Sequence, residues 1–324
     1  MIRALQVVRD DAGKVAVALR DDLTDDSLAE GDVTIDVEYS GINFKDGLAL
    51  AGSPGVMRVS PLIPGIDLVG TVSASSSPLW KAGNAVILNG WGIGETRDGG
   101  LTTRARVNGD WLVRLPTGIS ASRAAAIGTA GFTAALSVIA LGEVDGEVLV
   151  TGASGGVGST AIALLARAGH RVIASTGSPE HRDYLLGLGA ADTIDRATLS
   201  EAGRPLQKSR WAGVIDSVGG NTLANAIAQT NYGGRVAACG LVGGSDLPTT
   251  VMPFILRGVS LIGINSVECP MDARAAAWQL LERDLDLELL DSLTTSIALG
   301  EAEDAGAAIL RGELRGRTVV DVRA

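Results

Sequence analysis

The chain has few cysteine, histidine and aromatic residues for its length. Its 324 residues include two cysteines, two histidines and 3% aromatic residues. Cys239 and Cys269 form no CxxC pair, which argues against a disulfide framework and against a cysteine-built zinc site. Basic residues are scattered and the formal net charge is −10, so nucleic acid is not an expected partner. No apolar stretch of signal-peptide length opens the sequence, and we therefore expect a cytoplasmic protein.

One long run lacks charge altogether. The run Ala124–Gly142, "AAAIGTAGFTAALSVIALG", is apolar enough to resemble a membrane span. It is rich in alanine and is interrupted by Gly128 and Gly131. We expect a buried loop followed by a core helix, and no membrane partner.

The pattern of the chain changes near Glu147. Before it, short β-type runs such as "VTIDVEYSG", "DLVGTVSAS" and "NAVILNG" alternate with Gly, Pro and Asn breaks, which predicts a mostly β, barrel-like domain. After it, strands and amphipathic helices alternate, which predicts an α/β domain with a doubly wound parallel sheet of the Rossmann type. The tail after residue 290 reads as strand, helix, strand, so its last strand is expected to return to the first domain.

A glycine-rich loop, "VTGASGGVGS" at Val150–Ser159, follows the first strand of the predicted Rossmann domain. The spacing TGxxxGxG is typical of short-chain dehydrogenases, whereas AxxGxxG is an atypical fingerprint of medium-chain reductases. Short-chain enzymes need a Tyr-x-x-x-Lys pair, in which lysine lowers the tyrosine pKa for proton transfer. The three tyrosines are instead followed, four residues on, by Asn43, Leu188 and Val236. The short-chain interpretation therefore fails.

The loop predicts a dinucleotide site. Its glycines let the backbone approach a pyrophosphate, and the following helix offers unpaired amides at its N-terminus. The expected contacts are Ser154, Gly155, Gly156, Val157 and Gly158. A tight strand-to-helix turn without a ligand is the alternative.

The end of the next strand indicates NADPH. Enzymes that use NAD usually carry an acid there, whereas this chain has "STGSPEHR". Its hydroxyls and Arg182 suit a 2′-phosphate, and Glu180 is the one discordant acid. The expected contacts are Ser175, Thr176, Gly177, Ser178 and Arg182. A plain turn that caps the next helix is the alternative.

Several longer strings indicate a family. "SGINFKDGLALAG", "PLIPGIDLVGTV", "IGTAGFTAALSV" and "LPTTVMPFILRGVSLIGINSV" resemble the acryloyl-CoA reductase branch of the medium-chain dehydrogenase/reductases, of the quinone oxidoreductase type. The resemblance covers essentially the whole chain. It implies a GroES-like catalytic domain, residues 1–120 completed by 267–324, and a Rossmann NADP-binding domain, residues 121–266.

The resemblance also implies a reaction without zinc. Zinc-dependent relatives carry cysteine where Asn43 lies and Gly-His-Glu where "GID" lies, and both histidines of this chain fall in the Rossmann half. Three-ligand catalytic zinc is therefore not expected. The implied reaction is reduction of acryloyl-CoA to propanoyl-CoA by NADPH, with hydride added at the β-carbon and a proton at the α-carbon. An NADPH:quinone reductase and a non-catalytic NADPH-binding protein are the alternatives.

Candidate catalytic residues follow from the same resemblance. Asn43 is expected to orient substrate or nicotinamide, while Asp46 and Asp67 would position Lys45, a ribose or a water, or Asp67 would serve only a turn. Branch members commonly carry tyrosine where Phe44 stands, so no phenol can donate the proton, and water is the simpler donor. Phe44 can still contact the cofactor.

The remaining implied contacts are spread along the chain. For the cofactor they are Thr129, Arg196, Leu241, Ile255, Ser266 and Arg317. Leu241 and Ile255 could instead be core residues, and the two arginines could be surface charges. Lys45 and Arg58 are the main candidates for substrate phosphates. The apolar run "VSLIGINSV" favours a homodimer through the edge of the Rossmann sheet.

Overall fold

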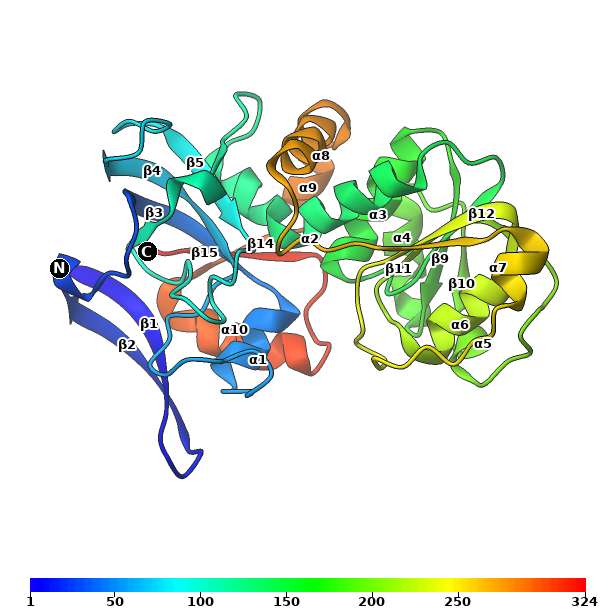
Figure 1. The fold of residues 1–324 in the computed structure, drawn as a ribbon, viewed down its shortest axis with the longest axis horizontal. Coiled ribbons are helices and arrows are strands. Elements are labelled where there is room, and N and C mark those ends of the chain that lie inside the picture. Colours follow the sequence, from blue (N-terminus) through cyan, green and yellow to red (C-terminus); the bar gives the residue numbers. More distant parts are fainter. The chain divides into compact units, whose positions relative to one another are not determined.

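The computed structural model describes residues 1–324, and its contacts divide the chain into two compact units. Unit 1 comprises residues 1–129, 266–275 and 287–324, and unit 2 comprises residues 130–265 and 276–286. Both ends of the chain therefore build unit 1 (Figure 1). The sequence predicts residues 276–286 in the first domain and residues 121–129 in the second, whereas their contacts place 276–286 in unit 2 and 121–129 in unit 1.

Unit 1 is built on a seven-stranded sheet with the order β14-β15-β3-β4-β5-β7, in which β6 also pairs with β3. Its strands are β3 (Val33–Ile42), β4 (Asp67–Ser75), β5 (Ala85–Asn89), β6 (Arg104–Val107), β7 (Val113–Arg114), β14 (Thr294–Ala298) and β15 (Arg317–Asp321). A separate hairpin pairs β1 (Ile2–Arg9) with β2 (Val15–Leu23). The C-terminal strand β15 runs antiparallel to β3, so the end of the chain completes this sheet.

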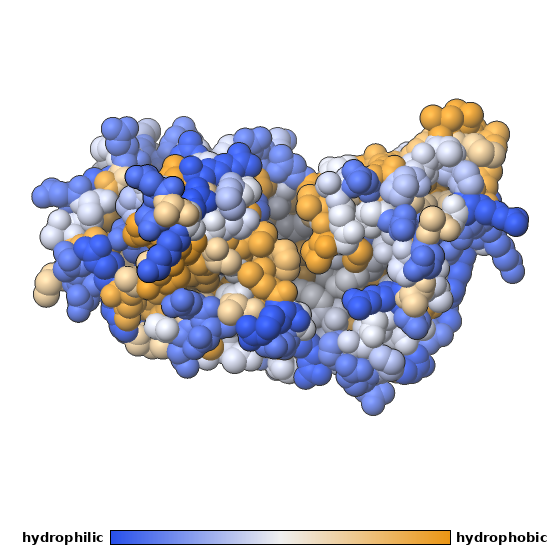
Figure 2. Space-filling model, turned by 90° about the horizontal axis from the view of Figure 1, so that it is seen from below, coloured by the Kyte–Doolittle hydropathy of each residue, from blue (hydrophilic) through white to orange (hydrophobic).

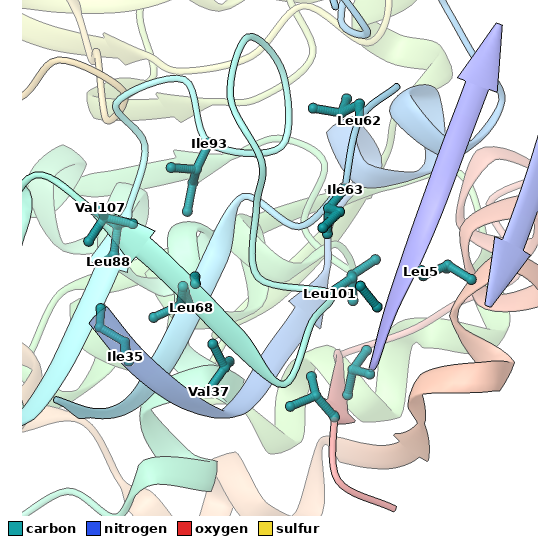
Figure 3. Packing of buried hydrophobic residues seen from close by; sticks show 14 of the residues in the cluster. Leu5, Ile35, Val37, Leu62, Ile63, Leu68, Leu88, Ile93, Leu101 and Val107 are labelled. Carbon is teal, nitrogen blue, oxygen red and sulfur yellow. The ribbon is translucent and has the colours of Figure 1, made fainter. Parts of the chain in front are cut away.

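Alternation of side chains along the strands explains the core of unit 1. Residues of β3 are alternately buried and half-buried from Val33 to Val37, as expected of a strand with one face on a core. Figure 3 shows Ile35 and Val37 of β3 near Leu68 of β4 and Leu88 of β5. Helix α1 (Phe44–Leu50) packs against α10 (Ala302–Leu310).

The ends of four strands meet at one edge of this sheet. Asp67 at the start of β4 pairs in register with Asn89 at the end of β5. Thr318 of β15 pairs with Ile42 at the end of β3, next to Asn43. This edge therefore collects polar residues from distant parts of the chain.

Unit 2 confirms the predicted doubly wound parallel sheet. The strand order is β10-β9-β8-β11-β12-β13, and the pairs are parallel. The order reverses between β8 and β11, which is where such folds bind ligands. The strands are β8 (Glu147–Val150), β9 (Arg171–Thr176), β10 (Asp192–Asp195), β11 (Trp211–Asp216), β12 (Thr230–Ala238) and β13 (Ser260–Gly263).

Short helices connect these strands (Figure 1). They are α3 (Gly156–Arg167), α4 (Arg182–Gly187), α5 (Ala197–Ser200), α6 (Gly220–Ala228) and α7 (Met252–Arg257). Two more helices, α8 (Met271–Asp284) and α9 (Leu287–Ser292), follow β13 in the chain. Every residue of the central strand β11 is buried, because helices cover both faces of a doubly wound sheet.

The long uncharged run forms α2 (Ala121–Leu141), which is broken at Gly128. The prediction of a loop before the core helix is therefore wrong, because residues on both sides of Gly128 are helical. A Cβ at Gly128, whose φ is +49°, would lie 2.5 Å from Asp67 Oδ2. By length and hydropathy α2 is the one helix that could cross a membrane, but 72% of its apolar window is buried, as in a core helix.

Candidate active site

A buried hydrogen-bond network surrounds Asn43, between β3 and α1. Asn43 donates from its backbone N and from Nδ2 to Asp46 Oδ2, at 2.8 and 3.0 Å. Nδ2 also donates to Asp67 Oδ2 at 2.8 Å. Both amide hydrogens are therefore used within the protein. Asn43 keeps only Oδ1 for a ligand, and that atom already accepts from Arg317 Nη1 at 3.2 Å.

Asp67 accepts more hydrogen bonds than the other residues of this network. Its Oδ1 accepts from Asn89 Nδ2 at 2.7 Å and from the backbone N and hydroxyl of Thr129 at 2.8 and 2.6 Å. Its Oδ2 lies 3.8 Å from Arg317 Nη2. The carboxylate is fully buried, so its role extends well beyond a turn. Sequence reasoning missed Asn89, whose only signal was its place at the end of a strand.

Arg317 is buried, which makes the surface-charge alternative wrong for this residue. It is 5% exposed and its Nε donates to the Ala126 carbonyl at 2.6 Å. Burial lowers the pKa of Arg317, while Asp67 and Asp46 raise it. The charge of Arg317 is therefore balanced mainly by Asp67, the carboxylate with which it forms an ion pair. Nη2 has no hydrogen-bond partner despite its burial.

Burial and the nearby Asp67 raise the pKa of Asp46 to about 7. Hydrogen bonds from Asn43 and from the Ile66 backbone, at 2.8 Å for the latter, oppose the shift. The two carboxylates bind the same amide group of Asn43, so the negative charge of Asp67 disfavours ionisation of Asp46. Asp46 therefore changes its charge near neutral pH.

This shift predicts a loss of stability as pH rises. The folded protein holds a proton on Asp46 up to about pH 7, whereas the unfolded chain releases that proton near the ordinary pKa of aspartate. Protonated Asp46 therefore stabilises the fold fully below the ordinary pKa, and this stabilisation is lost as the pH rises through the folded pKa. Between pH 5 and pH 8 the unfolding free energy should fall by roughly 2.5 kcal/mol from this group. Urea titrations of wild type and Asp46→Asn at both values test this, because the variant should lack the decline. An equal decline in both proteins would contradict it.

Lys45 and Arg58 flank Glu95 on the surface of unit 1. Lys45 Nζ donates to Glu95 Oε1 at 2.9 Å, so the idea that Asp46 or Asp67 positions Lys45 is wrong. The backbone N of Arg58 donates to the Glu95 carbonyl at 3.0 Å, and its side chain is exposed. Because Glu95 neutralises Lys45, Arg58 is the freer cation for a substrate phosphate. Phe44, at the start of α1, is 38% exposed.

In unit 2 the glycine loop has an open side and a packed side. Gly155 precedes α3 and is exposed, and a Cβ there would meet only Gly152 O at 3.3 Å. At Gly158 a Cβ would overlap Gly152 O and the Ala153 backbone. Gly158 therefore lets helix and strand pack closely, while Gly155 leaves room for a ligand. Ser154, Gly156 and Val157 are half-buried beside it, and the first amides of α3 are unpaired by helix geometry. The loop fits a pyrophosphate.

Arg196 lies against the turn that follows β9. A Cβ on Gly177 would overlap Arg196 Nε, and the backbone N of Arg196 donates to Thr176 O at 2.9 Å. Thr176 and Ser178 are partly exposed in this turn, whereas Ser175 is buried. The hydroxyl of Thr176 accepts from Ser178 N at 3.2 Å. This turn fits the phosphate of NADP.

Arg182 is engaged elsewhere. Its Nη1 donates to Asp192 Oδ1 at 2.9 Å and to the Thr193 hydroxyl at 2.7 Å. Arg196 is thus the cation that lies against the turn. The alternative expectation for Arg196 was a surface charge without a role.

Asp216, at the end of β11, was missed by sequence reasoning. Its Oδ1 accepts from the Thr151 hydroxyl at 2.6 Å and its Oδ2 from Gly219 N at 2.8 Å. Thr151 directly follows β8, so this pair joins the two strands at the point where the sheet order reverses. Burial raises the pKa of Asp216. The signal was an acid that ends an apolar strand before two glycines.

The other implied contacts are split between the units. Leu241 and Ile255 in unit 2 are 66% and 73% exposed, so the core alternative is wrong for both. Thr129 and Ser266 belong to unit 1. In the whole chain, no group of three or more His, Cys, Asp or Glu side chains could hold a metal ion.

Comparison with known proteins places the chain in a family. Residues 29–117 match the alcohol dehydrogenase GroES-like domain and residues 156–283 the zinc-binding dehydrogenase domain. The probable acrylyl-CoA reductase AcuI of Escherichia coli (strain K12) is 51% identical over 93% of this chain and 94% of its own. Acrylyl-CoA reductase AcuI of Ruegeria pomeroyi is 47% identical over the full length of both. The chain belongs to the acryloyl-CoA reductase family of medium-chain dehydrogenase/reductases.

The fold of this family is also that of a solved structure. The yhdH oxidoreductase from Salmonella enterica in complex with NADP has a TM-score of 0.96 and 50% identity, and 99% of each chain is covered. The predicted combination of a GroES-like domain and a Rossmann domain is thereby confirmed for this member of the acryloyl-CoA reductase family.

Proposed function

We propose that this protein is an NADPH-dependent reductase that converts acryloyl-CoA to propanoyl-CoA. Identity of 47–51% with two acrylyl-CoA reductases over nearly the whole chain carries the proposal. The Arg196 side chain against Gly177 supports NADPH as the cofactor. We assign the catalytic domain to unit 1 and the NADP-binding domain to unit 2. Both cysteines are free thiols, in keeping with a cytoplasmic enzyme.

Bound NADPH supplies the hydride for the β-carbon. The open side of the loop at Gly155 would hold the pyrophosphate, and Thr176, Ser178 and Arg196 the 2′-phosphate. For the nicotinamide half we keep the contacts proposed from the family: Phe44, Thr129, Leu241, Ile255, Ser266 and Arg317. Among these, the buried Arg317 acts through Asn43, whose Oδ1 it holds.

The protein's own residues orient the reacting groups and control the proton. Asn43 presents Oδ1 as a hydrogen-bond acceptor, because both of its amide hydrogens bind Asp46 and Asp67. Phe44 has no acidic proton, so the proton for the α-carbon comes from water. Backbone amides would stabilise the developing charge on the thioester oxygen.

The direct test follows the loss of NADPH absorbance with acryloyl-CoA, crotonyl-CoA and a benzoquinone in parallel, and repeats the acryloyl-CoA assay with NADH. We expect the highest kcat/KM with acryloyl-CoA and NADPH. A preference for the quinone would make the protein a quinone reductase, and binding of NADPH without turnover of any acceptor would make it a non-catalytic binding protein.

Arg58→Ala should weaken binding of the CoA part of the substrate. Loss of one exposed cation should raise the KM for acryloyl-CoA roughly 3- to 10-fold and leave kcat unchanged. The KM for acryloyl-pantetheine, which lacks the adenosine phosphates, should not change. A similar rise with both substrates would contradict the phosphate contact. Arg114→Ala, at an arginine of unit 1 that lies over Trp80, is the matched control.

We also propose a homodimer that forms through β13. This strand lies at one end of the sheet, and its Leu261 is 36% exposed. Val251 and Leu256, which also belong to unit 2, are 66% and 57% exposed. Figure 2 shows hydrophobic residues gathered on the surface at the end of unit 2, at the right of the view. An open strand edge beside an apolar surface suits pairing with a second copy.

Sedimentation velocity tests this assembly. The wild type should sediment as a dimer at micromolar concentration and Leu261→Lys as a monomer, because an edge lysine opposes strand pairing. Leu79→Lys, at an exposed leucine of unit 1, should remain dimeric. A monomeric wild type would contradict the proposal.

A further inference from the structure

Arg274 is a buried arginine that the reaction as described does not use. It is 1% exposed, and burial lowers its pKa to about 10, so it is charged at neutral pH. Its Nη1 donates to the Asn89 carbonyl at 2.8 Å, and its Nε to the Cys269 carbonyl at 2.9 Å. Its Nη2 donates to the carbonyls of Ser266 and Val267 at 3.1 and 2.9 Å. One side chain therefore joins two chain segments.

The first of these segments carries the candidate site. Asn89, whose carbonyl binds Arg274, donates from its own side chain to Asp67 Oδ1. Asp67 in turn holds the amide of Asn43. Three hydrogen bonds thus lead from the guanidinium of Arg274 to the residue expected beside the substrate.

The second segment carries Ser266, a proposed contact of the nicotinamide half. Its neighbour Val267 accepts a hydrogen bond from Trp91 N at 2.9 Å. A Cβ at Gly90 would lie 2.5 Å from Val267 O and 2.9 Å from Ser266 O, so the two segments are in direct backbone contact. The two segments are packed so closely that a methyl group at Gly90 would not fit between them.

The backbone of Trp91, which takes part in this contact, is strained. Its φ is +55°, and it is the one residue other than glycine with a positive φ. Such a conformation in a bulky residue persists only when surrounding contacts enforce it. Arg274 Cζ lies 5.0 Å from the Trp91 ring centroid, and Trp111 stacks on Trp91 with centroids 6.1 Å apart. The guanidinium is part of the structure that enforces the turn.

We propose that Arg274 is a positioning residue for the reduction, which sets the spacing between the Ser266 segment and the Asn89–Asp67–Asn43 hydrogen-bond chain. This inference rests on the proposed function. A planar guanidinium binds four carbonyls in fixed directions, and the ammonium of lysine cannot replace it in that geometry. A misplacement of about 1 Å in groups that orient a reaction is worth on the order of 100-fold in rate.

The matched control is Arg257, which also binds main-chain carbonyls. It donates to the carbonyls of Ala228, Thr230 and Gln207 at 2.8, 3.2 and 2.6 Å. Gln207 precedes β11, Ala228 precedes β12 and Thr230 begins β12, so the three acceptors lie at the amino ends of these parallel strands. The cofactor loops lie at the carboxyl ends of the same sheet. Arg257→Lys should therefore lower stability without changing the reaction.

The experiment compares Arg274→Lys and Arg257→Lys with the wild type. We expect both variants to lower Tm, and only Arg274→Lys to lower kcat for acryloyl-CoA, by roughly 10- to 100-fold. The Kd for NADPH, from its fluorescence, should change less than 3-fold in both. The primary isotope effect with NADPH deuterated at C4 should increase in Arg274→Lys alone, because hydride transfer becomes the slow step.

Three outcomes would overturn the proposal. They are a kcat within 2-fold of wild type in folded Arg274→Lys, an equal kcat loss in Arg257→Lys, and a loss with an unchanged isotope effect. If Arg274→Lys does not fold, Arg274→Gln, which buries no charge, takes its place with the same criteria. A wild type that does not reduce acryloyl-CoA would instead refute the proposed function.

Discussion

Asp67→Ala should lower the unfolding free energy by about 3–5 kcal/mol, which is the usual cost of removing one partner of a buried ion pair. The substitution leaves the buried Arg317 without its nearest carboxylate. It also removes the acceptor for Asn43, Asn89 and Thr129. Urea denaturation at neutral pH measures the change.

Two controls separate this effect from a general loss of charge. Asp291→Ala removes an exposed ion pair with Arg123 and should cost less than about 1 kcal/mol. The double variant Asp67→Ala/Arg317→Met removes both buried charges and should recover at least half of the loss. Asp67→Ala within about 1 kcal/mol of wild type would show that the network contributes little to stability.

Arg196→Ala should raise the Kd for NADPH roughly 10- to 100-fold, since a charge-assisted hydrogen bond to phosphate contributes about 1.5–3 kcal/mol. The Kd for NADH, which has no 2′-phosphate, should change less than 2-fold. Fluorescence titration with both nucleotides gives the two constants. The expected result is therefore a loss of discrimination between the cofactors.

Arg182→Ala is the control for this prediction, because Arg182 pairs with Asp192 and does not lie against Gly177. It should change the NADPH constant less than 3-fold. A larger effect at Arg182 than at Arg196, or an equal loss of NADH binding at Arg196, would place the 2′-phosphate elsewhere.

Local patterns were sufficient to predict the sheets, but not the contacts of individual side chains. Alternating strands and helices after Glu147 predicted the doubly wound sheet, because each element carries its own period in the sequence. Around Gly128 the sequence predicts a buried loop before the core helix. Gly128 instead lies where a helix passes close to Asp67 and Arg317, which are far away in sequence.

The candidate site shows the same limit. Residue types at Asn43, Asp46 and Asp67 indicated a polar centre, but nothing local revealed that the Asn43 amide would be fully bonded. Glu95, the partner of Lys45, is likewise distant in the chain. Hydrogen-bond partners depend on strand register and burial, and a single sequence specifies neither directly.

The pairing of Asp67 with Asn89 bears on how the β-sheet reaches one register. A slip of one residue between β4 and β5 would turn every side chain of the slipped strand to the opposite face. Asp67 would then lose Asn43, Asn89 and Thr129, and Arg317 would be left with a buried, uncompensated charge. The hydrophobic side chains already oppose such a slip, because it would turn them away from the core, and an unpaired buried ion adds a further penalty. The buried polar residues of the candidate active site therefore also favour the correct register of β4 and β5 during folding.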